Sequence, residues 1–109
     1  MKKILLILLS SLFLLSMKSD DCITADGYFR GVRLCGRVQI VERFPDFKVK
    51  VVDHFPDLKV KVVNTNANDP GEWQMVDRFP DIKIQIVDHF EDFTIRFVTT
   101  NPGVAKSCN

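Results

Sequence analysis

Hydrophobic and polar residues alternate in short stretches along residues 36–101. In the clearest example, Phe47, Val49 and Val51 are apolar while Lys48 and Lys50 are charged. Alternation with a period of two predicts a β-strand that buries one face, and the many β-branched residues favour the same conformation. The pattern predicts strands at Phe47–Val51, Leu58–Val62, Ile82–Ile86 and Phe93–Phe97.

These stretches belong to an internal repeat of about 11 residues. Its six units begin at Val38, Val49, Val60, Trp73, Ile84 and Ile95. Residues 36–66 align on residues 71–101 without a gap, with about half of the positions identical, so the units form two equivalent halves. Because the period is odd, each unit has to turn a corner before its apolar face points inward again. The expected fold is all-β, a compact wound β-repeat domain.

Phe-Pro-Asp, or a close variant of it, directly precedes each of the four predicted strands. Proline fixes φ and cannot donate a hydrogen bond, and aspartate accepts hydrogen bonds from nearby backbone N–H groups, so the segment is expected to form a corner. Each corner phenylalanine is expected to be buried, with a contribution of about 1.5–3 kcal/mol. The corner residues are Phe44, Pro45, Asp46, Phe55, Pro56, Asp57, Phe79, Pro80, Asp81 and Phe90.

Trp73 stands where the other units begin with valine or isoleucine. We expect it to pack in the core at the seam between the two halves, with a ligand-stacking platform as the alternative.

The segment at residues 71–85 reads GEWQMVDRFPDIKIQ and is flanked by further Val-Asp-x-Phe-Pro-Asp units. It resembles the 7(1) septoil knot domain family, and the resemblance extends over residues 36–103 although Glu91 replaces a proline. The resemblance implies a small, tightly wound chain with a knotted backbone, but no biochemical activity. Periodicity alone would suggest a β-solenoid or an intertwined β-sandwich, because knots are nearly absent from ordinary folds.

The first residues predict export from the cell. Lys2 and Lys3 precede a stretch from Ile4 to Leu15 that is apolar apart from two serines. This stretch is shorter than a membrane span of about 20 residues and fits a signal peptide at residues 1–19. An uncleaved anchor or a lipid on Cys22 is the alternative. The rest divides into an N-terminal extension (20–35), the repeat domain (36–103) and a C-terminal tail (104–109), expected to be periplasmic or secreted.

All three cysteines lie outside the repeat units. In an oxidising compartment we expect one disulfide and one free thiol. A Cys35–Cys108 bond would join the two ends of the core, whereas Cys22–Cys35 would close only a local loop. Chain entropy favours the longer closure, so Cys35–Cys108 is preferred and Cys22 is the alternative partner.

Charge excludes one class of partner. Three of the 15 Lys and Arg residues precede residue 20, which leaves 12 against 14 Asp and Glu. Without a basic stripe, nucleic acid is not an expected partner. A row of polar strand positions is expected to face outward, as solvated surface or as a face for an anionic polymer or cell-envelope partner. It comprises Gln39, Lys50, Lys61, Gln74, Gln85 and Arg96.

The sequence gives little support for a catalytic site or a metal site. His54 and His89 hold equivalent positions and, with Asp57 and Asp92, are weak candidates for metal ligands. Other units carry arginine at the histidine position, so neither a metal nor a cofactor is expected. Every corner has its acidic residues, which suits a turn better than a catalytic pair, and no nucleophile motif is present. We expect an exported, non-catalytic structural or binding module of the bacterial exterior. The alternative is a hydrolase or metal-binding protein using Asp and His at the corners.

Overall fold

The computed structural model describes residues 22–108, which form nine β-strands and no helix. The strands are β1 (Tyr28–Phe29), β2 (Val32–Arg33), β3 (Gly36–Ile40), β4 (Phe47–Val51), β5 (Leu58–Val62), β6 (Glu72–Met75), β7 (Ile82–Ile86), β8 (Phe93–Phe97) and β9 (Gly103–Val104). The all-β prediction is confirmed, and the four strands predicted from alternation have the expected bounds. The predicted signal peptide lies outside the described residues. No helix in residues 22–108 has the length and hydropathy needed to cross a membrane.

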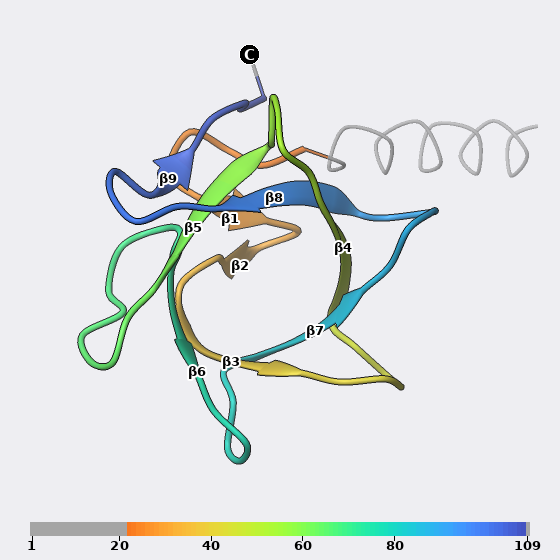
Figure 1. Ribbon diagram of the computed structural model, residues 1–109, viewed down its shortest axis with the longest axis vertical. Coiled ribbons are helices and arrows are strands. Elements are labelled where there is room, and N and C mark those ends of the chain that lie inside the picture. The colour runs from red at the N-terminus through yellow and green to blue at the C-terminus, as the bar shows by residue number, and fades with distance from the viewer. Residues whose placement is uncertain (1–21, 109) are drawn as a thin grey trace, which may run out of the picture.

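Six parallel strands form a closed barrel. Their order is β6-β3-β7-β4-β8-β5, and β5 pairs with β6 to complete the ring (Figure 1). Strands of the first half therefore alternate with strands of the second half, so neither half has a core of its own. The short strand β9 adds antiparallel to β5, and β1 and β2 form a separate hairpin. The barrel is neither the open solenoid nor the two-layer sandwich that periodicity alone suggested.

The register places inward side chains in layers. The third position of one strand lies opposite the first position of the next, as with Val38 and Ile82 or Ile84 and Phe47. The same offset recurs around the ring, so the strands are strongly tilted. Third-position residues, with Trp73 of β6 counted from Gly71 as the repeat aligns it, fill the centre of the barrel with 0% exposure: Val38, Val49, Val60, Trp73, Ile84 and Ile95.

Residues 22–35 cover one end of the barrel and belong to its core. Ile23, Phe29 and Leu34 are buried, and the Phe29 ring lies 5.3 Å from the Phe47 ring and 5.1 Å from the Phe93 ring. Figure 1 shows the β1–β2 hairpin inside the outline of the ring. Residues 22–35 of the predicted N-terminal extension are therefore an integral part of the fold.

Trp73 is fully buried, as predicted for a core residue at the seam. Its indole Nε1–H donates a hydrogen bond of 3.2 Å to the backbone carbonyl of Leu34. The tryptophan thereby joins the barrel to the covering segment. Because the ring has no exposed face, the alternative of a ligand-stacking platform at Trp73 is wrong.

The corner phenylalanines are not buried, so that prediction was wrong. Phe44, Phe55, Phe79 and Phe90 are 77–91% exposed and have φ between 52° and 62°. The barrel interior is already filled by first- and third-position residues, and the left-handed backbone turns each corner outward. Asn66 and Asn101 hold a similar φ where the other two units end.

The corner aspartates carry the structural role instead. Each carboxylate accepts a hydrogen bond from a backbone N–H of the neighbouring strand, and the aspartate N–H donates to the carbonyl of that same residue. For Asp46 and Lys83 both distances are 2.8 Å. We call these reciprocal pairs the aspartate clamps, and they comprise Asp46–Lys83, Asp57–Thr94, Asp81–Arg37 and Asp92–Lys48.

Replacing Phe44 by asparagine is expected to leave the free energy of unfolding unchanged or to raise it by up to about 1 kcal/mol, because asparagine tolerates a positive φ better than phenylalanine. Urea denaturation followed by circular dichroism measures the change. The matched control is Phe47→Asn, at a position that is only 4% exposed, and it should lose several kcal/mol. A loss of more than about 2 kcal/mol for Phe44→Asn would show that the ring is packed after all.

The disulfide joins Cys22 to Cys108, with the two Cα atoms 5.5 Å apart. The preferred Cys35–Cys108 pairing was therefore wrong, and Cys35 is a free thiol. The C-terminal tail returns to the covering segment, where the Cys108 N–H donates 2.8 Å to the carbonyl of Ile23. This contact brings Cys108 beside Cys22 and leaves Cys35 against the loop at residues 63–71.

Candidate functional site

The residues that the sequence offered as metal ligands do not converge. His54 and His89 are exposed at the corners, whereas the carboxylates of Asp57 and Asp92 are engaged in aspartate clamps. Within residues 22–108, no three His, Cys, Asp or Glu side chains are grouped so that they could hold a metal ion. The carboxylates of Asp57 and Asp92 thus accept hydrogen bonds from backbone N–H groups, as expected for residues that form turns.

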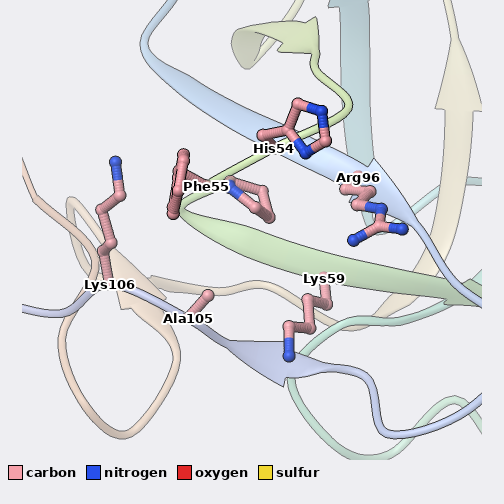
Figure 2. Close-up of a pocket in the computed structure, with 7 residues that line it drawn as sticks. His54, Phe55, Lys59, Arg96, Ala105 and Lys106 are labelled. Atoms are coloured by element: carbon pink, nitrogen blue, oxygen red, sulfur yellow. The ribbon is translucent and has the colours of Figure 1, made fainter.

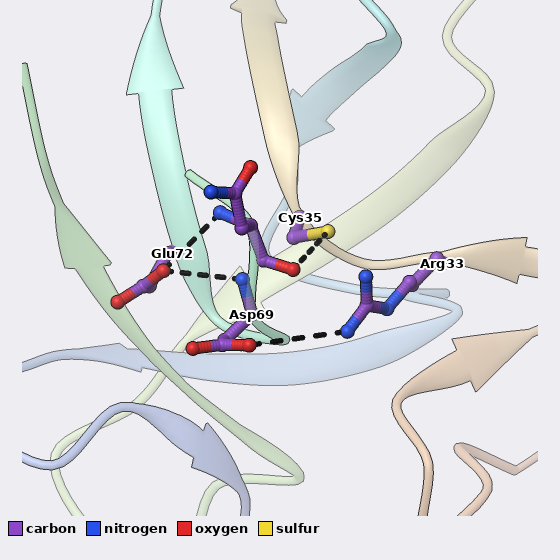
Figure 3. A network of polar contacts seen from close by, with 5 residues as sticks. Arg33, Cys35, Asp69 and Glu72 are labelled. Carbon is purple, nitrogen blue, oxygen red and sulfur yellow. Dashed lines mark hydrogen bonds and ion pairs between the residues drawn. The ribbon is translucent and has the colours of Figure 1, made fainter. Parts of the chain in front are cut away.

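Cys35 lies in a polar network that fixes the loop before β6 (Figure 3). Its thiol donates to the carbonyl of Asn68 at 3.6 Å, and the Glu72 carboxylate accepts from the N–H groups of Asn68 and Asp69. Arg33 lies 4.0 Å from the Asp69 carboxylate. Burial raises the pKa of Cys35, with Arg33 lowering it and nearby acids raising it further. The network holds a protonated thiol, which is a poor nucleophile.

Alkylation of Cys35 by iodoacetamide is expected to be slower than that of a small free thiol at the same pH. Because the pKa is raised, the thiolate fraction at neutral pH is reduced, and the rate should keep rising at a pH where a thiol with an ordinary pKa of about 8.5 has levelled off. Mass spectrometry over a pH series measures the rate, with glutathione as the reference. A rate that levels off at or below the pH of the reference would contradict the raised pKa.

A pocket lined by basic side chains lies where β5, β8 and the C-terminal tail meet (Figure 2). Its volume is about 350 Å³. Lys59 comes from β5, Arg96 from β8 and Lys106 from the tail, while His54, Phe55 and Pro56 come from the β4–β5 corner. None of the described residues that line it is acidic.

The pairing of strands places two of these cations side by side. Lys59 and Arg96 are direct partners in the register of β5 and β8. Like charges at neighbouring positions on adjacent strands repel, so this arrangement costs stability. At the five equivalent places around the barrel the cation faces a neutral or acidic partner: Lys48–Gln85, Lys50–Thr94, Lys83–Gln39, Arg37–Gln74 and Lys61–Glu72.

Lys59 also lacks the aspartate clamp that its equivalents have. Arg37, Lys48 and Lys83 each have an aspartate carboxylate on their backbone N–H. Extending the register of β5 and β6 places Pro70, two residues before β6, opposite Lys59, and proline has neither a carboxylate nor an N–H. No other described residue forms a salt bridge with Lys59, Arg96 or Lys106. The lining of the pocket therefore carries positive charge that no salt bridge among the described residues neutralises, and Lys106 also borders a neighbouring hollow that contains Asp57 and Asp92.

Lys106 is placed by the fold of the tail. The N–H groups of Ala105 and Lys106 both donate to the carbonyl of Asp57, at 2.8 and 3.1 Å. Two residues later the disulfide fixes Cys108 to Cys22. The backbone of Lys106 is thus held against the corner by hydrogen bonds and, two residues on, by the disulfide.

A second hollow shares Lys59 and Arg96 with the first. Its volume is about 400 Å³, and it is walled by the segment from Phe97 to Asn101, which includes Thr99 and Thr100. We call the two hollows together the cationic groove. It is lined by His54, Phe55, Pro56, Lys59, Arg96, Phe97, Val98, Thr99, Thr100, Asn101, Ala105 and Lys106.

Sequence reasoning found only part of this groove. Arg96 belonged to the predicted outward row, but Gln39 and Gln85 of that row donate their side-chain amides to the carbonyls of Asp77 and Glu42. Those two glutamines therefore support corners. Lys59 and Lys106 were missed, because their place in the same pocket as Arg96 depends on strand order and on the position of the tail.

Comparison with known proteins agrees with the fold. The family model described as 7(1) septoil knot domain matches residues 31–105. The match covers most of the chain and confirms the resemblance that the repeat units indicated. The comparison with curated proteins finds no match.

Proposed function

The chain belongs to the 7(1) septoil knot domain family, and we propose that it is an exported, non-catalytic binding module that holds an anionic partner in its cationic groove. The observation that carries this proposal is the juxtaposition of Lys59 and Arg96 on adjacent strands, with Lys106 across the pocket and no acidic residue in the lining. Cations that the fold places on adjacent strands repel each other, and a bound anion relieves that repulsion.

Two features support a location outside the cell. Residues 1–19 have the composition of a signal peptide, and the bond between Cys22 and Cys108 is of the kind that persists in an oxidising compartment. The partner we propose is an anionic polymer of the cell envelope or exterior. The corner aspartates offered for hydrolysis are held in the clamps, which supports a role without catalysis. The interleaving of the two halves is consistent with the knotted backbone that the family's description names, which we include in the proposal.

The test is a calorimetric titration of the full chain with poly-L-glutamate, with neutral dextran as the reference polymer. We expect saturable binding of poly-L-glutamate that weakens as salt is added, because screening reduces attraction between exposed charges. Lys59→Gln with Arg96→Gln should reduce the affinity about tenfold or more, since it removes two charge-assisted contacts.

The matched control is Lys48→Gln with Lys83→Gln, which removes the same net charge from exposed positions on β4 and β7. This control should retain most of the affinity. Equal losses in the two double variants would show general attraction to a charged surface and would contradict a groove site. Absence of binding to any polyanion would also contradict the proposal.

A further inference from the structure

We infer that the partner in the cationic groove is an acidic polysaccharide, with a sugar carboxylate between Lys59 and Arg96 and a sugar ring against Phe55. This inference rests on the proposed function and names the chemical class of its ligand. It depends on three properties of the groove: its length, its exposed aromatic ring and its neutral hydrogen-bonding wall.

The groove is longer than a site for one small anion. Lys59 and Arg96 line both hollows, so these two residues lie at the boundary between a space of about 350 Å³ and one of about 400 Å³. A ligand that is centred on these charges and fills both sides has to be extended. A chain of linked units fits this shape better than a single anion does.

Phe55 supplies a ring that the fold itself does not need. The side chain is 82% exposed and its backbone has a φ of 55°, a conformation that disfavours phenylalanine. Asn101 has a similar φ at the end of another unit, so a phenyl group is not required to turn such a corner. The ring lines the groove beside His54, with the two ring centroids 6.3 Å apart. An exposed flat ring beside cations suits stacking against the apolar face of a sugar.

The other end of the groove offers neutral polar groups. Thr99, Thr100 and Asn101 line the second hollow and provide hydroxyl and amide groups that both donate and accept hydrogen bonds. Sugar hydroxyls have the same dual capacity. At the centre, the planar Arg96 guanidinium matches a carboxylate through two parallel hydrogen bonds. A carboxylated sugar polymer satisfies the cations, the ring and the neutral wall together.

The experiment compares three probes on the full chain by calorimetry: oligogalacturonate, poly-L-glutamate and inorganic polyphosphate. We expect oligogalacturonate to bind about tenfold more tightly than poly-L-glutamate at equal carboxylate concentration, because only the sugar acid adds stacking to the charge contacts. Equal or tighter binding of poly-L-glutamate or polyphosphate would overturn the inference. The proposed function would stand in that case as long as binding still depended on Lys59 and Arg96.

The variant that isolates the ring is Phe55→Asn, which suits the positive φ and removes the aromatic group. It should weaken oligogalacturonate binding about tenfold and poly-L-glutamate binding much less, because the peptide has no sugar ring to stack, while the matched variant Phe44→Asn at another corner should change neither. If Phe55→Asn leaves oligogalacturonate binding unchanged, or weakens both probes equally, the sugar-stacking inference fails. Circular dichroism confirms that each variant is folded.

Discussion

Replacing Trp73 by alanine is expected to lower the free energy of unfolding by about 3–5 kcal/mol. The indole is fully buried in the central layer of the barrel, and its N–H is hydrogen-bonded to Leu34 in the covering segment. The substitution both opens a cavity and leaves the Leu34 carbonyl without that donor. Trp73 is the only tryptophan, so its replacement removes the usual fluorescence signal. Urea denaturation followed by circular dichroism therefore measures the loss.

Two further variants keep this prediction testable if the alanine variant does not fold. Trp73→Phe retains most of the ring but removes the donor to Leu34, and it should lose about 1–3 kcal/mol. Phe79→Ala truncates an aromatic residue that is 77% exposed and should change stability by less than about 1 kcal/mol. Equal losses at Trp73 and Phe79 would contradict the assignment of the core.

Removal of the disulfide is expected to have the next largest effect. The Cys22–Cys108 bond closes a loop with a sequence separation of 86 residues, and its loss through Cys22→Ser with Cys108→Ser should lower the free energy of unfolding by about 2–5 kcal/mol. The tail that carries Lys106 should then loosen, so the affinity of the groove for poly-L-glutamate should also fall. Thermal denaturation and calorimetry measure the two effects.

The control for this prediction is Cys35→Ser. Cys35 is a free thiol that donates only to the carbonyl of Asn68, so its replacement should have a much smaller effect on stability and none on binding. A Cys35→Ser variant as unstable as the double serine variant would contradict the observed pairing. Unchanged affinity in a folded double variant would show that Lys106 does not depend on the bond.

Strand positions were the part of the fold that the sequence predicted best. Alternation located β4, β5, β7 and β8 with the bounds that the structure has. It does so because every second residue of a strand lies on the same face of the sheet. Strand order did not follow from the same signal. The alternation of Leu58 and Lys59 in β5 is equally compatible with several neighbouring strands. Only the long-range pairing in the structure selects β8 and β9 as neighbours of β5.

The corners and the disulfide show where sequence reasoning failed. Phe44 was expected inside because phenylalanine is apolar, but direction at a corner depends on the sign of φ, which the residue type did not indicate. The entropy argument for the disulfide was sound but was applied to only two pairs. The Cys22–Cys108 pair closes a longer loop than either, so it would have been preferred.

The cationic groove could not be predicted from composition, because residues 20–109 have slightly more acidic than basic residues. It depends on which charges the fold leaves unbalanced. Clamps place aspartates beside Arg37, Lys48 and Lys83, and the loop ending in Pro70 removes that aspartate beside Lys59. A close comparison of the six units at this position would have revealed the missing acid, but not the approach of Lys106.

The most direct measurement of the groove's role is a two-dimensional NMR titration of the isotope-labelled full chain with oligogalacturonate. The account predicts saturable shifts that are largest for the backbone amides of Lys59, Arg96 and Lys106 and small for those of Lys48 and Lys83. Shifts that are largest around Lys48 and Lys83, or that are spread over the barrel without saturation, would contradict a binding site where β5, β8 and the tail meet.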